Sequence, residues 1–158
     1  MRSKSRQIGR KLCIFGTFAL ILAAMCACTP REKLPDGLNE FADSFRAANQ
    51  AESIDPMLKL YNLRKADKRT IRLLKATLSN ELGLPIMEIV FSPLTGAPEE
   101  TICFEHDGVA YGPSHTPEYR MSVYHDSEDG FTSRYTIGRI KSGKWKILCS
   151  KPLPEPKL

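Results

Sequence analysis

The feature that most constrains this chain is its start, where a basic run leads into an apolar segment and then into two cysteines. The apolar segment runs from Leu12 to Met25 and is shorter than the ~20 apolar residues that a membrane-spanning helix needs. A positive end, a short apolar stretch and small residues before a polar continuation are typical of a secretory signal peptide. We therefore predict that residues 1–27 are a signal peptide removed on export. Its basic residues are Arg2, Lys4, Arg6, Arg10 and Lys11.

The end of this segment, Met25-Cys26-Ala27-Cys28, resembles the lipobox of bacterial lipoproteins. In that family, the cysteine after a small residue receives a lipid such as palmitate and becomes the first residue of the mature chain. The resemblance implies that Cys28 is the lipidation site, with Cys26 as the alternative, and that the chain is exported and lipid-anchored, facing the periplasm. The next residue, Thr29, is not aspartate, which in lipoproteins favours the outer membrane of a two-membrane cell. An ordinary cleaved signal peptide is the alternative interpretation.

The net positive charge of the chain comes from its predicted signal segment. The whole sequence has 23 Lys and Arg against 18 Asp and Glu, a formal net charge of +5. Five basic residues and no acidic ones precede Cys28, so the mature chain has equal numbers of each and is neutral. A neutral domain gives no electrostatic support for nucleic-acid binding, and we expect no nucleic-acid partner.

The remaining chain has the length of a single domain with two short flanking segments. Residues 28–37 contain Pro30, Pro35 and charges but little apolar material, which predicts a tether. Residues 38–150 are enough for one hydrophobic core, so we predict a single domain there. Residues 151–158 form a proline-rich tail that we expect to be loose.

Helical patterns occupy the first half of the predicted domain. A first helix is expected from Leu38 to about Ala51, because apolar residues recur there at helical spacing. Pro56 suits the first turn of a short second helix. Asp67 is the candidate N-cap of a third helix, which Gly83 and the following Pro85 end. The core-facing residues of the first helix are Leu38, Phe41, Ala42, Phe45 and Ala48.

Strand patterns occupy the second half of the predicted domain. The segments are short and rich in β-branched and aromatic residues, and several alternate between apolar and polar positions. Asp107 and Gly108 predict a tight hairpin turn, because this pair tolerates positive φ angles. Helices first and antiparallel strands after predict an α+β domain. The expected strands cover residues 86–91, 101–104, 109–111, 119–124, 131–140 and 144–149.

The order of these elements, together with the opening Phe41-Ala42-x-x-Phe45-x-x-Ala48-Asn49, resembles the NTF2-like superfamily and its SnoaL-like branch. The resemblance covers about residues 38–149. It implies that the N-terminal helices pack into the concave side of a strongly bent antiparallel sheet, forming a cone in which such domains bind ligands. A first strand between the second and third helices is not evident from the sequence. A cystatin-like roll is the alternative fold.

Two cysteines remain in the domain after the signal segment is removed, Cys103 and Cys149. An oxidising compartment would allow them to form a disulfide, worth ~4 kcal/mol in the entropic description of so long a loop. Strand alternation places Cys149 on the side of Trp145 and Ile147, and Cys103 on the side of Glu105. If those faces are opposite, the two residues remain free thiols. Both alternatives stay open.

Three histidines are the candidates for acid–base chemistry. His106 and His125 each precede an aspartate, and His115 lies in a loop. His106 and His125 fall at predicted turns, where we expect solvated side chains, so His125→Ala should leave folding unchanged. The spacing of the histidines fits no zinc motif, and we expect no metal and no cofactor.

Aromatic and basic residues suggest two binding surfaces. Seven basic residues lie between Lys59 and Lys75, with Asp67 as the single acidic one, a pattern that fits anionic headgroups or an ordinary solvated helix face. Aromatic residues on successive strands are candidates to line a cavity, with core packing or cross-strand pairing as the alternative. These candidate lining residues are Tyr111, Tyr119, Tyr124, Tyr135 and Trp145.

Together these patterns predict a membrane-anchored envelope lipoprotein that binds rather than catalyses. The expected partners are the membrane, through the N-terminal lipid, and either a small apolar ligand or an envelope protein. One alternative is a small SnoaL-like enzyme with acid–base residues in the cone. Another is a purely structural envelope protein. We find no phosphate-binding loop, nucleophile elbow or paired-cysteine metal motif.

Overall fold

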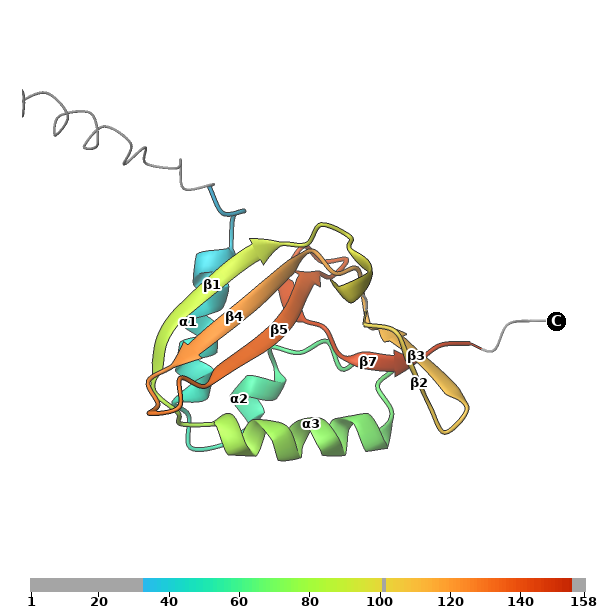
Figure 1. Ribbon diagram of the computed structural model, residues 1–158, viewed down its shortest axis with the longest axis horizontal. Helices are drawn as coiled ribbons and strands as arrows, with labels where there is room; N and C mark the ends of the chain where they lie inside the picture. The colour runs from blue at the N-terminus through green and yellow to red at the C-terminus, as the bar shows by residue number, and fades with distance from the viewer. Residues whose placement is uncertain (1–32, 101, 155–158) are drawn as a thin grey trace, which may run out of the picture. The chain divides into compact units, whose positions relative to one another are not determined.

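The computed structural model describes residues 33–100 and 102–154, which form an α+β fold with three helices beside two antiparallel sheets (Figure 1). This confirms the predicted fold class. The predicted signal peptide and the lipidation candidates Cys26 and Cys28 lie outside the described residues. In the described part of the chain, no helix has both the length and the apolar character of a membrane span.

The three helices are α1 (Leu38–Asn49), α2 (Asp55–Leu58) and α3 (Lys68–Glu81). The predicted N-cap of α3 is confirmed, because Asp67 Oδ1 accepts a hydrogen bond of 2.6 Å from the backbone N–H of Thr70. The predicted stop is also confirmed. The helix ends before Gly83, which has the positive φ of 83° that glycine adopts readily.

The larger sheet contains four strands in the order β1-β4-β5-β6, all antiparallel. Met121, Val123 and Ile137 are fully buried, because these residues of β4 and β5 point to the helix side of the sheet. Tyr61 forms an isolated parallel bridge with Ile147 beside β6, in the connection between α2 and α3. The strands are β1 (Ile86–Pro93), β4 (Tyr119–His125), β5 (Thr132–Arg139) and β6 (Trp145–Ile147).

The smaller sheet has the order β2-β3-β7. Asp107 and Gly108 form its predicted hairpin turn, with φ angles of 52° and 73°. The sequence does not predict the third strand, because β7 belongs mostly to the segment 151–158, which it suggests is a loose tail. Its backbone pairs with β3 instead, and Leu153 N–H continues the pairing to Ala110 O at 2.8 Å. The strands are β2 (Phe104–His106), β3 (Val109–Pro113) and β7 (Ser150–Pro152), preceded by the short helix η1 (Pro98–Glu100).

The core lies between α1 and the curved face of the larger sheet (Figure 1). Phe45 is 1 % exposed and its ring lies 5.2 Å from that of Tyr135 on β5. The apolar residues predicted for α1 supply this contact, since Leu38, Phe41, Phe45 and Ala48 are all buried. Burial of such a stripe, rather than helix propensity, stabilises a helix of this length.

The folded unit begins earlier than the sequence predicts. It starts at Leu34, which packs against the core, so residues 34–37 of the predicted tether belong to the domain. Trp145 Nε1 donates a hydrogen bond of 3.0 Å to the backbone oxygen of Asp36. This contact was not predictable, because Trp145 lies far along the sequence and offers one N–H that requires a partner when buried.

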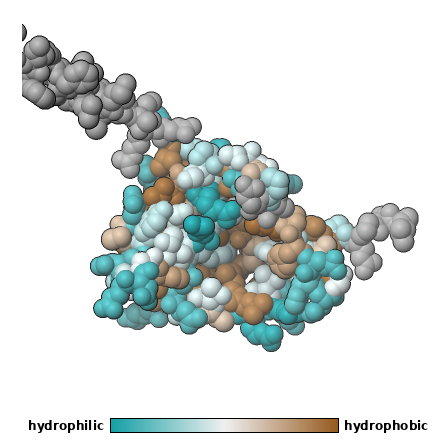
Figure 2. Space-filling model, in the orientation of Figure 1, coloured by the Kyte–Doolittle hydropathy of each residue, from teal (hydrophilic) through white to brown (hydrophobic). Residues whose placement is uncertain are grey.

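Helix α3 packs more loosely than α1. Leu78 is its single buried residue, while Ile71 and Leu74 on the same stripe are half-buried. Figure 2 shows a hollow between α3 and the sheet, with hydrophobic residues around it. The helix therefore covers the concave side of the domain without filling it completely.

Candidate functional site

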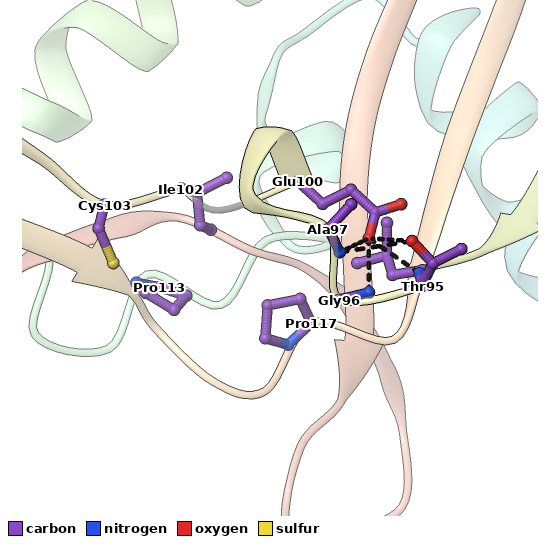
Figure 3. A pocket seen from close by; sticks show the side chains of 9 residues that line it. Thr95, Gly96, Ala97, Glu100, Ile102, Cys103, Pro113 and Pro117 are labelled. Atoms are coloured by element: carbon purple, nitrogen blue, oxygen red, sulfur yellow. Dashed lines mark hydrogen bonds between the residues drawn. The ribbon is translucent and has the colours of Figure 1, made fainter.

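An apolar pocket lies between the segment that leads into β2 and the loop that joins β3 to β4 (Figure 3). Its volume is about 380 Å³, within the range of small-molecule sites. Aliphatic and proline side chains form most of the wall, and Thr95, Glu100 and Cys103 are the lining residues with polar side chains. The lining residues are Leu94, Thr95, Gly96, Ala97, Glu100, Ile102, Cys103, Pro113 and Pro117.

The carboxylate of Glu100 organises one wall of this apolar pocket (Figure 3). Its Oε2 accepts hydrogen bonds from the backbone N–H groups of Thr95, Gly96 and Ala97, at 2.8, 2.8 and 3.1 Å. Partial desolvation raises the pKa of Glu100, but these hydrogen bonds outweigh it and hold the pKa below its usual value. The three amides that would otherwise attract an anion are therefore already satisfied by the chain itself.

The sequence leaves open whether the two cysteines of the domain form a disulfide or remain free thiols. In the structure, both are free thiols. Cys103 is exposed and lies on the wall of the apolar pocket, in the loop before β2. Cys149 is buried in the segment between β6 and β7, and burial raises the pKa of its thiol.

The five aromatic candidates for a shared cavity divide into separate groups. Tyr111 belongs to the smaller sheet and stacks on Phe104, with ring centroids 5.0 Å apart. Tyr119 contacts Trp145 edge-to-face at 5.7 Å. Tyr124 is 39 % exposed, on the side of β4 away from the helices. With Tyr135 packed on Phe45, this arrangement matches the alternative of core packing and aromatic pairing.

The three histidines occupy different environments. His106 is solvated at the hairpin, as expected, with its Nε2 3.2 Å from Asp107. The expectation for His125 is wrong: it is 3 % exposed, because β4 extends through it and turns its ring toward the core side. His115 is half-buried and forms hydrogen bonds in the β3–β4 loop.

A partly buried polar network that the sequence does not reveal joins α3 to β5. Glu81 Oε2 accepts hydrogen bonds from Ser133 Oγ at 3.0 Å and from the hydroxyl of Tyr135. Ser133 Oγ also lies 3.3 Å from Nε2 of His125, while Nδ1 of this histidine is buried without a hydrogen-bond partner. Burial, together with Glu81, raises the pKa of Tyr135, so its hydroxyl remains a donor at neutral pH.

A second pocket, of about 440 Å³, places Glu81 beside Thr77, Asn80, Leu84 and Phe131. The position of this carboxylate at the end of α3 could not be predicted from the sequence, where it is one acidic residue of a charged helix. Among the described residues, no cluster of three or more histidine, cysteine, aspartate or glutamate side chains has an arrangement that could hold a metal ion.

Comparison of the chain with protein-family models, with curated proteins and with solved structures found no match.

Proposed function

We propose that this chain is a lipid-anchored envelope protein whose folded domain binds a small apolar ligand without catalysing a reaction. The observation that carries the proposal is the apolar pocket beside Glu100. A pocket of about 380 Å³ walled by aliphatic and proline side chains favours a ligand that buries carbon rather than charge. Because Glu100 occupies the three nearby amides, the pocket presents few unpaired donors to a polar ligand.

The location in the proposal rests on the signal segment. Lipidation at Cys28, or at Cys26 in the alternative frame, would place the lipid a few residues before Leu34, where the folded unit begins. A link this short holds the domain close to the membrane surface, where apolar molecules concentrate. The periplasmic side of an outer membrane is the location that the residue after Cys28 favours.

The fold in the proposal is an NTF2-like cone, with a cystatin-like roll as the alternative. The curved sheet with helices on one side supports the cone (Figure 1). The bridge between Tyr61 and Ile147 gives further support, because it puts an extended segment between the second and third helices, where the sequence shows no strand.

Native mass spectrometry of protein extracted from membranes tests ligand binding. We expect the native mass to exceed the denatured mass by one discrete small molecule. Ala97→Trp, which fills the apolar pocket, should abolish this excess, and Ala47→Trp on the exposed side of α1 should preserve it. Equal native and denatured masses in the wild-type protein, or loss of the excess in both variants, would contradict the proposal.

Membrane fractionation tests the anchor. We expect Cys28→Ser to move the protein from the membrane fraction to the soluble fraction, and the denatured mass of the wild type to show cleavage before Cys28 with attached lipid. Release by Cys26→Ser, with Cys28→Ser still bound, would select the alternative frame. Continued attachment of both variants would rule out a lipid anchor at either cysteine.

A small acid–base enzyme is a second candidate function, and the geometry of Glu81 favours it. Glu81 lines a pocket, and its carboxylate accepts hydrogen bonds from two hydroxyl groups. A carboxylate beside hydroxyl groups can act as a general acid or base. The ligand recovered from the native protein decides between the two functions. Its chemical conversion by the wild type, lost in Glu81→Gln, would establish catalysis, and its unchanged recovery from both would establish binding.

A further inference from the structure

A third pocket lies on the other side of the β3–β4 loop from the apolar pocket. Pro113 and Pro117 line the apolar pocket, whereas the three residues between them line the third one. Its volume is about 420 Å³, and all of its lining residues except Ile140 have polar or charged side chains. We name it the basic pocket, and its lining residues are Asn62, Arg64, Ser114, His115, Thr116, Arg139, Ile140, Lys141 and Ser142.

The charge of the basic pocket is positive, because three of its lining residues are cationic and none is acidic. Arg139 is already neutralised by Glu118, which its guanidinium contacts at 3.1 and 3.2 Å, and it lies over the Trp145 ring at 4.9 Å. Arg64 and Lys141 are exposed, and neither forms an ion pair within residues 33–100 and 102–154. The positive charges of these two side chains can therefore pair with an anionic ligand.

The wall behind these cations is fixed by His115. Its Nδ1 accepts a hydrogen bond from Asn62 Nδ2 at 3.1 Å and lies 3.0 Å from Ser114 Oγ. Its Nε2 lies 3.1 Å from the backbone oxygen of Gly138, which only accepts, so the ring proton resides on Nε2. Burial lowers the pKa of His115, which keeps the ring neutral at pH 7. His115 thus positions the loop and adds no charge.

The donors converge from three separate segments of the chain. Arg64 comes from the connection between α2 and α3, Thr116 from the β3–β4 loop, and Lys141 with Ser142 from the turn between β5 and β6. A tetrahedral oxyanion can accept hydrogen bonds from several directions at once, and arginine with lysine is a common pair for phosphate. We infer that the basic pocket binds the phosphate group of a ligand through Arg64 and Lys141.

This inference is independent of the apolar ligand, because the two pockets share no lining residue. The phosphate could come from a soluble phosphomonoester or from the diester of a lipid headgroup, and two probes distinguish these sources. Inorganic phosphate represents the first, and glycerophosphoglycerol, the soluble headgroup of phosphatidylglycerol, represents the second. Both are titrated into the full chain in an uncharged detergent, at constant ionic strength, and followed by amide NMR shifts.

We expect saturable shifts of the Thr116 and Ser142 amides with at least one probe. The double variant Arg64→Gln/Lys141→Gln should weaken binding by about tenfold or more, because it removes both unpaired charges. The charge-matched control Arg134→Gln/Lys75→Gln, at exposed positions outside the pocket, should retain wild-type affinity. The stronger probe identifies the source of the phosphate. Absence of saturable shifts with both probes, or equal weakening in the two double variants, would overturn the inference.

Discussion

Tyr111 and Asp67 are joined by a hydrogen bond of 3.0 Å, from the tyrosine hydroxyl to Oδ2 of the carboxylate. The other oxygen of the same carboxylate accepts from the N–H of Thr70 and caps α3. One aspartate therefore caps the start of the helix and ties it to the smaller sheet. The hydrogen bond from the Thr70 amide is the main cause that lowers the pKa of Asp67. In turn, the hydrogen bond to Asp67 raises the pKa of Tyr111.

Asp67→Ala should lower the melting temperature more than Asp43→Ala, an exposed aspartate of α1 that serves as the control. The difference should depend on pH. Because the folded-state pKa of Asp67 lies below its unfolded value of about 3.9, its ionised form stabilises the fold above that pH and loses this effect as pH falls through the folded pKa. Thermal melts between neutral and strongly acidic pH check this. A difference in melting temperature between the two variants that persists at strongly acidic pH would contradict this prediction.

His125→Ala should destabilise the domain, contrary to the expectation from the sequence. The ring is 3 % exposed and contacts Phe131 at 5.2 Å, so its removal leaves a cavity that costs about 2–4 kcal/mol. His125→Leu should remain within about 1 kcal/mol of the wild type, because it fills the space and removes the unpartnered Nδ1. Urea denaturation of both variants measures these free energies. Equal destabilisation by the two would show that the nitrogen atoms of His125 matter more than its volume.

Gly138→Ala should disturb the basic pocket. A Cβ atom at this position would lie 2.0 Å from the backbone oxygen of Thr116, so either β5 or the β3–β4 loop must move. We expect a loss of about 1–3 kcal/mol in the free energy of unfolding, as for other overpacked sites, together with amide NMR shifts from His115 to Pro117. Arg134→Ala, at an exposed position of the same strand, should leave both unchanged. An unperturbed loop in Gly138→Ala would disprove the close approach.

Cys103 should react with maleimide in the native protein about a hundredfold faster or more than Cys149. Cys103 is exposed, whereas Cys149 is 6 % exposed and burial raises the pKa of its thiol. Peptide mapping after labelling, with and without denaturant, assigns the rates. Denatured protein should show similar rates at both residues. Slow labelling of both in the native state, restored by a reductant, would instead indicate the disulfide.

Local chemistry determined the elements that the sequence predicts well. The stripe of Leu38, Phe41 and Phe45 specifies α1, because helical spacing places these residues on one face. Asp67 specifies the start of α3, and the Asp107-Gly108 pair specifies the hairpin, because these short-range hydrogen bonds and backbone preferences depend on neighbouring residues alone.

Tertiary structure decided where those elements end and which side chains meet. The pairing of β7 with β3 and the contact of Trp145 with Asp36 join segments that are distant in sequence. The burial of His125 depends on how far β4 continues. Alternation and spacing indicate which face a residue occupies, but not which distant backbone satisfies its hydrogen bonds. The two sides of the β3–β4 loop, one apolar and one basic, arise from the same cause: neighbouring residues of one loop line pockets completed by other parts of the chain.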